Sequence, residues 1–96
     1  MRRDVRRVER IVSLGCIICR RQGLNSPAEA HHPLRGGRRI GQDVVIPLCA
    51  AHHRGTVKGV IGRDQSKRRF EQAYDVTEEE LLAETEKLLE MIYGGG

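Results

Sequence analysis

Apolar residues recur at helical spacing near the start of the chain. Over residues 4–14, the apolar positions that share one side of a helix are Val5, Val8, Ile11 and Val12. The opposite side carries the arginines Arg3, Arg6, Arg7 and Arg10. This pattern predicts a basic amphipathic helix that Gly15 ends. The arginine stripe fits a phosphate backbone or a plain solvated surface equally well.

The last third of the chain predicts two further helices. A short helix over residues 67–74 is expected to bury Phe70, Ala73 and Tyr74. Thr77 and Glu80 form a capping box for the final helix, and Val76 can contact Leu81 across its start. The apolar face of the final helix consists of Leu81, Leu82, Leu88, Leu89 and Ile92. We expect this helix to be structural, with no part in chemistry.

Two short apolar runs in the middle predict strands over residues 28–32 and 44–48. A flexible basic loop is expected over residues 35–39, and a short helix is expected to begin near Cys49. The chain therefore predicts one small α+β domain over residues 1–96. Its expected parts are a basic helix (1–14), a metal-bearing core (15–66) and C-terminal helices (67–93).

All three cysteines and all four histidines gather at metal-ligand spacing. Cys16 and Cys19 form a C-x-x-C knuckle, and Cys49 and His52 repeat that spacing with a histidine last. Three thiolates and one imidazole complete a tetrahedral structural Zn²⁺ site. An odd number of cysteines without an export signal also fits metal thiolates in the cytoplasm better than disulfides. Unbound buried thiols are the alternative.

His31, His32 and His53 remain once those four ligands are assigned. Adjacent strand residues point to opposite faces, so His31 and His32 should have different roles. On a helix, His53 points about 100° away from His52. A second, open metal site can therefore form between the strand and the helix. Alternatively, these histidines are ordinary surface or core residues, and His31 could instead orient the loop by a hydrogen bond.

The net charge of +4 hides a strong asymmetry along the chain. Residues 1–69 carry 16 Lys and Arg against 5 Asp and Glu, whereas residues 70–96 carry 1 against 8. A basic body around a metal site favours a nucleic-acid partner. The alternative is a surface that pairs with its own acidic C-terminal helix. The chain has no apolar run of about 20 residues and no signal-peptide pattern, so no membrane partner is expected.

These residues resemble the HNH endonucleases, which have the ββα-metal (His-Me finger) fold. Most of the chain is similar to the recombination enhancement function proteins of phages and prophages, which are RecA-dependent HNH nucleases. The segments that carry this resemblance are GCIICRRQG, AEAHHPLRGGRRIGQD, VIPLCAAHHRGTVKG and RRFEQAYDVTEEELL. The resemblance implies a metal-dependent DNA endonuclease in the cytoplasm of a bacterial host, acting with RecA filaments on single-stranded DNA.

The resemblance also implies roles for individual residues. His31 and His53 would bind the catalytic ion, which would be Mg²⁺, Mn²⁺ or Zn²⁺, and His32 would be the general base that activates water. Histidine suits that task because its ordinary pKa lies near neutral pH. Hydrolysis would leave 5′-phosphate and 3′-hydroxyl ends. The residues expected to contact DNA phosphates are Arg35, Arg38, Arg39, Arg54 and Lys58.

One position departs from the family motif. The middle Asn of the motif falls at Val44, five residues before Cys49. That Asn holds the loop between the two strands. Asp43 could replace it by pinning the loop, or it could touch the metal ion.

Two other classes of protein compete with the nuclease interpretation. A catalytically silent zinc-finger DNA-binding module would share the zinc site and the basic surface, and would leave His31, His32 and His53 without a role. Zinc deaminases use His-x-Glu and Pro-Cys-x-x-Cys patterns. Neither pattern occurs here. Pro33, and not a glutamate, stands two places after His31, and the sequence has no Pro-Cys-x-x-Cys segment.

Overall fold

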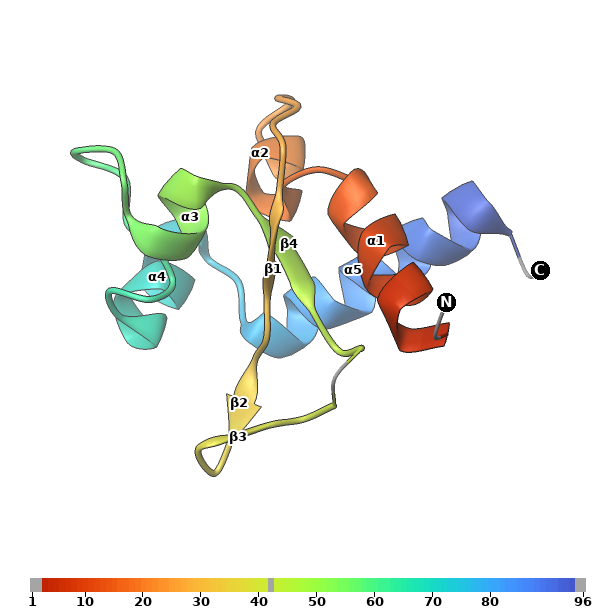
Figure 1. Cartoon of the computed structure of the whole chain (residues 1–96). Coiled ribbons are helices and arrows are strands. Elements are labelled where there is room, and N and C mark those ends of the chain that lie inside the picture. The colour runs from red at the N-terminus through yellow and green to blue at the C-terminus, as the bar shows by residue number, and fades with distance from the viewer. Residues whose placement is uncertain (1–2, 42, 95–96) are drawn as a thin grey trace.

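The computed structural model describes residues 3–41 and 43–94 (Figure 1). The helices and strands, in chain order, are α1 (Arg3–Ser13), α2 (Ile17–Arg21), β1 (Glu29–His31), β2 (Leu34–Arg35), β3 (Arg38–Arg39), β4 (Ile46–Leu48), α3 (Ala50–Arg54), α4 (Lys67–Tyr74) and α5 (Glu78–Tyr93). This is the small α+β architecture that the sequence predicts. Within the described part of the chain, no helix has the length and apolarity that a membrane span needs.

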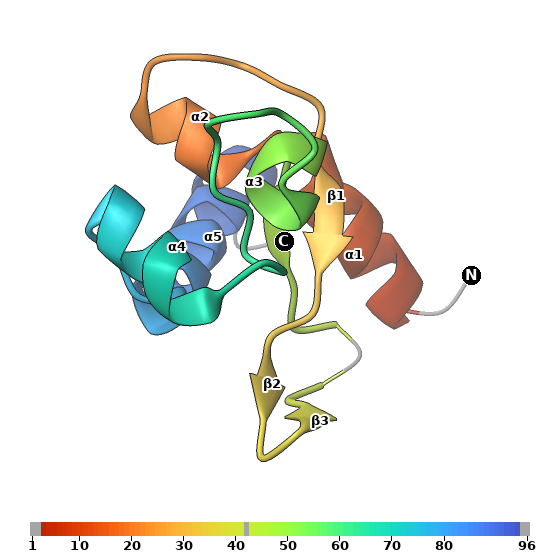
Figure 2. The same ribbon diagram turned by 90° about the vertical axis from the view of Figure 1, so that its left-hand side faces the viewer.

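An antiparallel pair of strands, β1 and β4, forms the centre of the molecule. Glu29 lies opposite Leu48, and His31 lies opposite Ile46. Helices α1 and α3 lie on opposite sides of this pair (Figures 1 and 2). Both strands are shorter than predicted: each has three residues, and His32 already lies outside β1 because the chain turns toward Pro33. The pair therefore presents His31 on one face, directly beside α3.

The expected flexible loop over residues 35–39 is instead an ordered hairpin of β2 and β3. Arg35 pairs with Arg38 in its register, and the turn between them is Gly36-Gly37. Both glycines have positive φ angles, 62° and 80°, which a two-residue hairpin turn requires. The hairpin projects from the body of the protein (Figures 1 and 2) and exposes its arginines.

The cysteine knuckle lies at the start of a short helix, α2. Cys16 is the N-cap of this helix, and its Sγ accepts a hydrogen bond from the Cys19 backbone N–H at 3.4 Å. A helix is favoured here because it buries the two isoleucines between the cysteines. The largest buried cluster consists of Cys16, Ile17, Ile18, Cys19, Ile46, Leu48, Phe70, Val76 and Leu81.

Helix α1 forms where predicted and docks against α5 partly through charge. Ile11 is buried, while Val5 is 44% exposed. Arg7 forms ion pairs with Glu86 of α5 and with Asp43. Arg21 of α2 pairs in the same way with Glu84 of α5 at 3.1 Å. A part of the basic surface is therefore neutralised by the acidic helix of the same chain.

The two C-terminal helices confirm most of the predicted pattern. The Thr77 hydroxyl caps α5 by accepting from the Glu80 N–H at 3.1 Å. Phe70 and Leu81 are fully buried, but the predicted burial of Ala73 is wrong, since Ala73 is exposed on α4. Ile92 is also exposed, because the last turns of α5 extend beyond the core.

We expect Leu81→Ala to lower the free energy of unfolding by about 2–5 kcal/mol, because a fully buried leucine leaves a cavity. Met91→Ala on the same helix is the matched control, since Met91 is 70% exposed; its effect should stay within about 0.5 kcal/mol. Urea unfolding of the zinc-loaded proteins measures both values. Equal losses in the two variants would contradict this placement of the core.

Candidate functional site

Four side chains from two short helices meet in one cluster, called here the Cys3His cluster: Cys16, Cys19, Cys49 and His52. Cys16 and Cys49 are the N-cap residues of α2 and α3, and Cys19 and His52 lie one turn into those helices. Their ligand atoms all lie within 4.8 Å of one another. The two helices therefore deliver two ligands each to the same point.

The distances within the Cys3His cluster match a tetrahedral metal site. The Nδ1 atom of His52 lies 3.4 Å, 3.5 Å and 3.2 Å from the Sγ atoms of Cys16, Cys19 and Cys49. The Sγ atoms of Cys19 and Cys49 lie 3.8 Å apart. Tetrahedral zinc with bonds of about 2.3 Å to sulfur and 2.0 Å to nitrogen gives edges of about 3.8 Å and 3.5 Å. The four residues are thus close enough to bind a metal ion, consistent with structural zinc.

The electrostatics of this cluster favour a cation. Burial raises the pKa of the Cys16 thiol to about 12, although a backbone hydrogen bond from Cys19 opposes the rise. Burial also lowers the pKa of His52, which keeps its imidazole neutral and able to act as a ligand. A divalent cation would supply the positive charge that a buried thiolate needs, so metal binding in this cluster would be coupled to folding.

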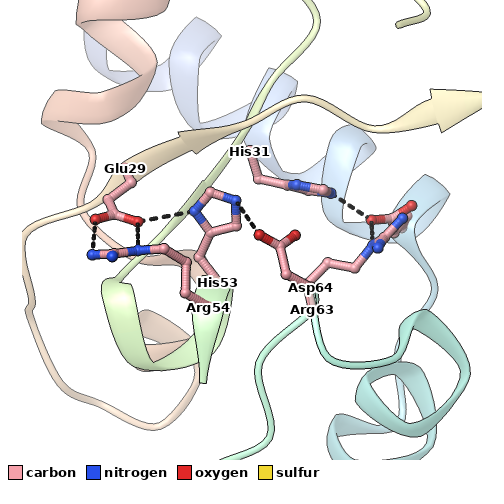
Figure 3. Close-up of polar contacts among 7 residues, drawn as sticks. Glu29, His31, His53, Arg54, Arg63 and Asp64 are labelled. Atoms are coloured by element: carbon pink, nitrogen blue, oxygen red, sulfur yellow. Dashed lines mark hydrogen bonds and ion pairs between the residues drawn. The ribbon is translucent and has the colours of Figure 1, made fainter. Parts of the chain in front are cut away.

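A second cluster, called here the His2Asp cluster, lies on the other side of α3. It consists of His31 from β1, His53 from α3 and Asp64 from the following loop, whose ligand atoms also lie within 4.8 Å of one another. The two imidazole rings approach edge to face with centroids 5.2 Å apart. Figure 3 shows His31, His53 and Asp64 converging from three separate segments of the chain. Two imidazoles and one carboxylate can hold a divalent metal ion.

Each histidine of the His2Asp cluster also contacts a glutamate carboxylate outside the cluster. The Nε2 atom of His31 lies 2.7 Å from Glu78 Oε2, and the Nδ1 atom of His53 lies 2.9 Å from Glu29 Oε1 (Figure 3). Glu78 also accepts from Arg63 Nε at 2.7 Å. Burial raises the pKa of Glu78, but the hydrogen bonds from His31 and Arg63 outweigh it and lower the value to about 2.

The His2Asp cluster opens to solvent through a cavity of about 330 Å³. His32 lines this cavity together with His31, and Arg39 of the β2–β3 hairpin lines it as well. The complete lining consists of Ala30, His31, His32, Leu34, Arg39, His53, Arg63 and Asp64. All three histidines left over from the Cys3His cluster therefore meet at one surface pocket.

The other candidate residues lie outside this pocket. The Asp43 carboxylate faces Arg7 Nε at 3.5 Å, and Asp43 belongs to neither group of metal-ligating side chains in the described part of the chain. Arg54 is held by Glu29 through two hydrogen bonds of 3.0 Å and 2.7 Å. Arg35 and Arg38 are exposed on the hairpin. Lys58 lines a separate cavity of about 450 Å³.

Sequence reasoning missed Asp64, Glu78, Glu29 and Arg63. Glu78 had a signal: together with Leu81, Leu82 and Thr85 it follows the i, i+3, i+4, i+7 spacing of the buried face of α5. The first turn of α5 delivers Glu78 to His31, so this helix contacts the site, although no part in chemistry is expected of it. Asp64 had no signal, since it lies in a loop without periodicity.

We expect two adjacent histidines to differ in their effect on tightly bound zinc. His52→Ala should lose the tightest zinc site and several kcal/mol of stability, because it removes a ligand of the Cys3His cluster. His53→Ala should keep that site. Competition with a chromophoric zinc chelator, together with thermal unfolding, distinguishes the two variants. Tight zinc retained in His52→Ala would argue against the Cys3His site.

Comparison with known protein families gives a match over most of the chain. A family model described as recombination enhancement, RecA-dependent nuclease matches residues 2–90. Neither the curated proteins nor the solved structures gave a match. The matched region contains both clusters, the hairpin and the turn of α5 that carries Glu78. The chain belongs to the family of recombination-enhancement, RecA-dependent nucleases.

Proposed function

We propose that the protein is a metal-dependent DNA endonuclease of the HNH type, with β1, β4 and α3 as its ββα-metal (His-Me finger) core. The observation that carries this proposal is the single open pocket that brings together His31, His32 and His53. An antiparallel strand pair followed directly by a ligand-bearing helix supports the fold assignment. The family membership supports the nuclease activity.

The His2Asp cluster is proposed to hold the catalytic divalent ion, with Asp64 as a third ligand beside His31 and His53. This donor set fits Mn²⁺ or Zn²⁺ better than Mg²⁺, which prefers oxygen ligands and water. A bound ion would stabilise the negative charge that develops on the phosphate and the leaving oxygen. The Cys3His cluster is proposed to hold structural zinc, since its four positions are all occupied by protein ligands.

His32 is proposed to accept a proton from the attacking water. Its neutral imidazole can do so near neutral pH, and it lines the same cavity as the metal-binding residues. The water oxygen forms a new bond to phosphorus while the bond from phosphorus to the 3′ oxygen breaks. The 3′ oxygen takes up a proton, and the products carry 5′-phosphate and 3′-hydroxyl ends.

The DNA is proposed to lie across the pocket and along the β2–β3 hairpin. Arg39 lines the pocket, and Arg35 and Arg38 continue the positive charge outward along the hairpin. Lys58 lines a separate cavity and is a further candidate phosphate contact, whereas Arg54 is already paired with Glu29. The family name supports action with RecA filaments, which implies work in the cytoplasm of a bacterial cell.

We expect His32→Ala to lower the rate of DNA cleavage by about 10²–10⁴-fold, the usual contribution of a general base. Folding and zinc content should remain, because His32 is not part of the Cys3His cluster. The assay uses single- and double-stranded DNA with Mn²⁺ or Mg²⁺, with and without RecA filaments. Salt-sensitive DNA binding without cleavage by the wild type would favour a silent zinc-finger module instead.

Two aspartates provide a matched test of the metal ligands. Asp64→Asn should lower cleavage by at least roughly tenfold and raise the Mn²⁺ concentration needed for half-maximal rate, because a ligand loses its charge. Asp43→Asn should cleave almost as the wild type does, since Asp43 faces Arg7. The rate is measured over a Mn²⁺ titration. A larger loss in Asp43→Asn than in Asp64→Asn would reverse the assignment.

A further inference from the structure

We propose that Glu78 is a positioning residue that fixes the tautomer and orientation of His31, so that His31 presents Nδ1 to the proposed catalytic ion. This inference rests on the proposed function of the His2Asp cluster. It concerns a buried carboxylate, on a helix outside the metal-binding core, that the cleavage steps themselves do not use.

The contact between Glu78 and His31 is buried and short. Only 3% of Glu78 and 5% of His31 is exposed, and Glu78 Oε2 lies 2.7 Å from His31 Nε2. The same Oε2 atom accepts from Arg63 Nε at 2.7 Å, so this oxygen acts as an acceptor and the imidazole donates from Nε2. Nδ1 of the neutral ring is then unprotonated and has its lone pair available for a metal ion. This arrangement is the carboxylate–histidine–metal pattern by which proteins orient metal ligands.

His53 uses its two nitrogens in the opposite sense. Its Nδ1 faces Glu29 at 2.9 Å, and its Nε2 faces Asp64 Oδ2 at 3.6 Å. His31 thus turns Nε2 away from the cluster, while His53 turns Nε2 toward Asp64 (Figure 3). Each glutamate contacts one nitrogen of its histidine, so the other nitrogen of that ring faces the shared site. Glu29 of β1 and Glu78 of α5 therefore have equivalent tasks.

The position of Glu78 is itself fixed from three sides. Arg63 Nε donates to the same Oε2 atom at 2.7 Å, so the guanidinium and the His31 imidazole share one carboxylate oxygen. The backbone N–H of Glu78 donates to Glu71 of α4 at 2.8 Å. Lys67 Nζ lies 3.9 Å from the other carboxylate oxygen. Because these contacts restrain the Glu78 side chain, its carboxylate can orient the His31 ring.

Arg63 and Asp64 connect the His2Asp cluster to Glu78. They are adjacent in sequence, and Arg63 points to Glu78 while Asp64 points to His53 (Figure 3). A purely structural ion pair between Arg63 and Glu78 would stabilise the fold without any effect on the metal ligands. The experiment must therefore measure metal binding and the His31 ring separately from stability.

The test compares Glu78→Met, Glu78→Gln and Glu79→Gln in zinc-loaded protein without DNA. Methionine removes every strong acceptor, whereas glutamine keeps an oxygen that can accept from His31. Glu79 is exposed on the same turn and is the control. We expect Mn²⁺ affinity for the His2Asp cluster to fall by about 10–100-fold in Glu78→Met, less in Glu78→Gln and not at all in Glu79→Gln. Calorimetry measures the affinity, and far-UV circular dichroism checks the fold.

Nitrogen-15 NMR of the histidine rings reports the tautomer directly. In the wild type, His31 should carry its proton on Nε2, and Glu78→Met should give a mixture of tautomers. Unchanged Mn²⁺ affinity in a folded Glu78→Met, or a wild-type His31 that carries its proton on Nδ1, would overturn the inference. The wild-type spectrum decides the question even if Glu78→Met does not fold. In a further outcome, the wild type carries the His31 proton on Nε2 and yet binds no Mn²⁺. That result would overturn the proposed catalytic site and leave the role of Glu78 in orienting His31 intact.

Discussion

The short helix α3 is the constraint on which both clusters depend. Its neighbouring residues His52 and His53 point about 100° apart, so one helix can serve two clusters on two of its sides. Their backbone carbonyls accept hydrogen bonds of 2.8 Å each from the N–H groups of Arg63 and Asp64. The returning chain is therefore fixed to the same two residues that belong to the two clusters, so the backbone couples the positions of the clusters.

The return of the chain toward α3 requires close packing of backbone against backbone. Gly55 ends α3 with a φ of 73°, in the left-handed region. A Cβ atom on Gly62 would overlap the backbone of Arg54 and Gly55, so only glycine permits this approach. With one phenylalanine and no tryptophan in the whole chain, the core contributes little to hold such a turn. A metal ion in the Cys3His cluster would hold α3 from its other side and would supplement the small hydrophobic core.

The sequence was sufficient to predict the chemistry that depends on local spacing. The two C-x-x-C/H knuckles, the two central strands, the helices α1, α3, α4 and α5 and the Thr77 cap follow from periodicity and from ligand spacing within one turn, whereas α2 and the β2–β3 hairpin do not. The partners of His31 and His53 did not follow, because they come from residues 47 and 24 positions away. Glu78, Glu79 and Glu80 are chemically identical. Helical spacing marks Glu78 as the one on the buried face of α5, but only the folded structure shows that Glu78 meets His31.

The ion pairs within the chain also change how much of its positive charge is available to a partner. Counting residues suggested a basic body over residues 1–69, but Arg7, Arg21, Arg54 and Arg63 are all bound to carboxylates of the same chain. Neutralised arginines attract a polyanion only weakly, since their charge is already compensated. Across the described residues, no carboxylate lies within ion-pair distance of the hairpin arginines Arg35, Arg38 and Arg39. The hairpin arginines are therefore among the described basic residues whose charge no carboxylate compensates, and Arg39 lines the same pocket as His32.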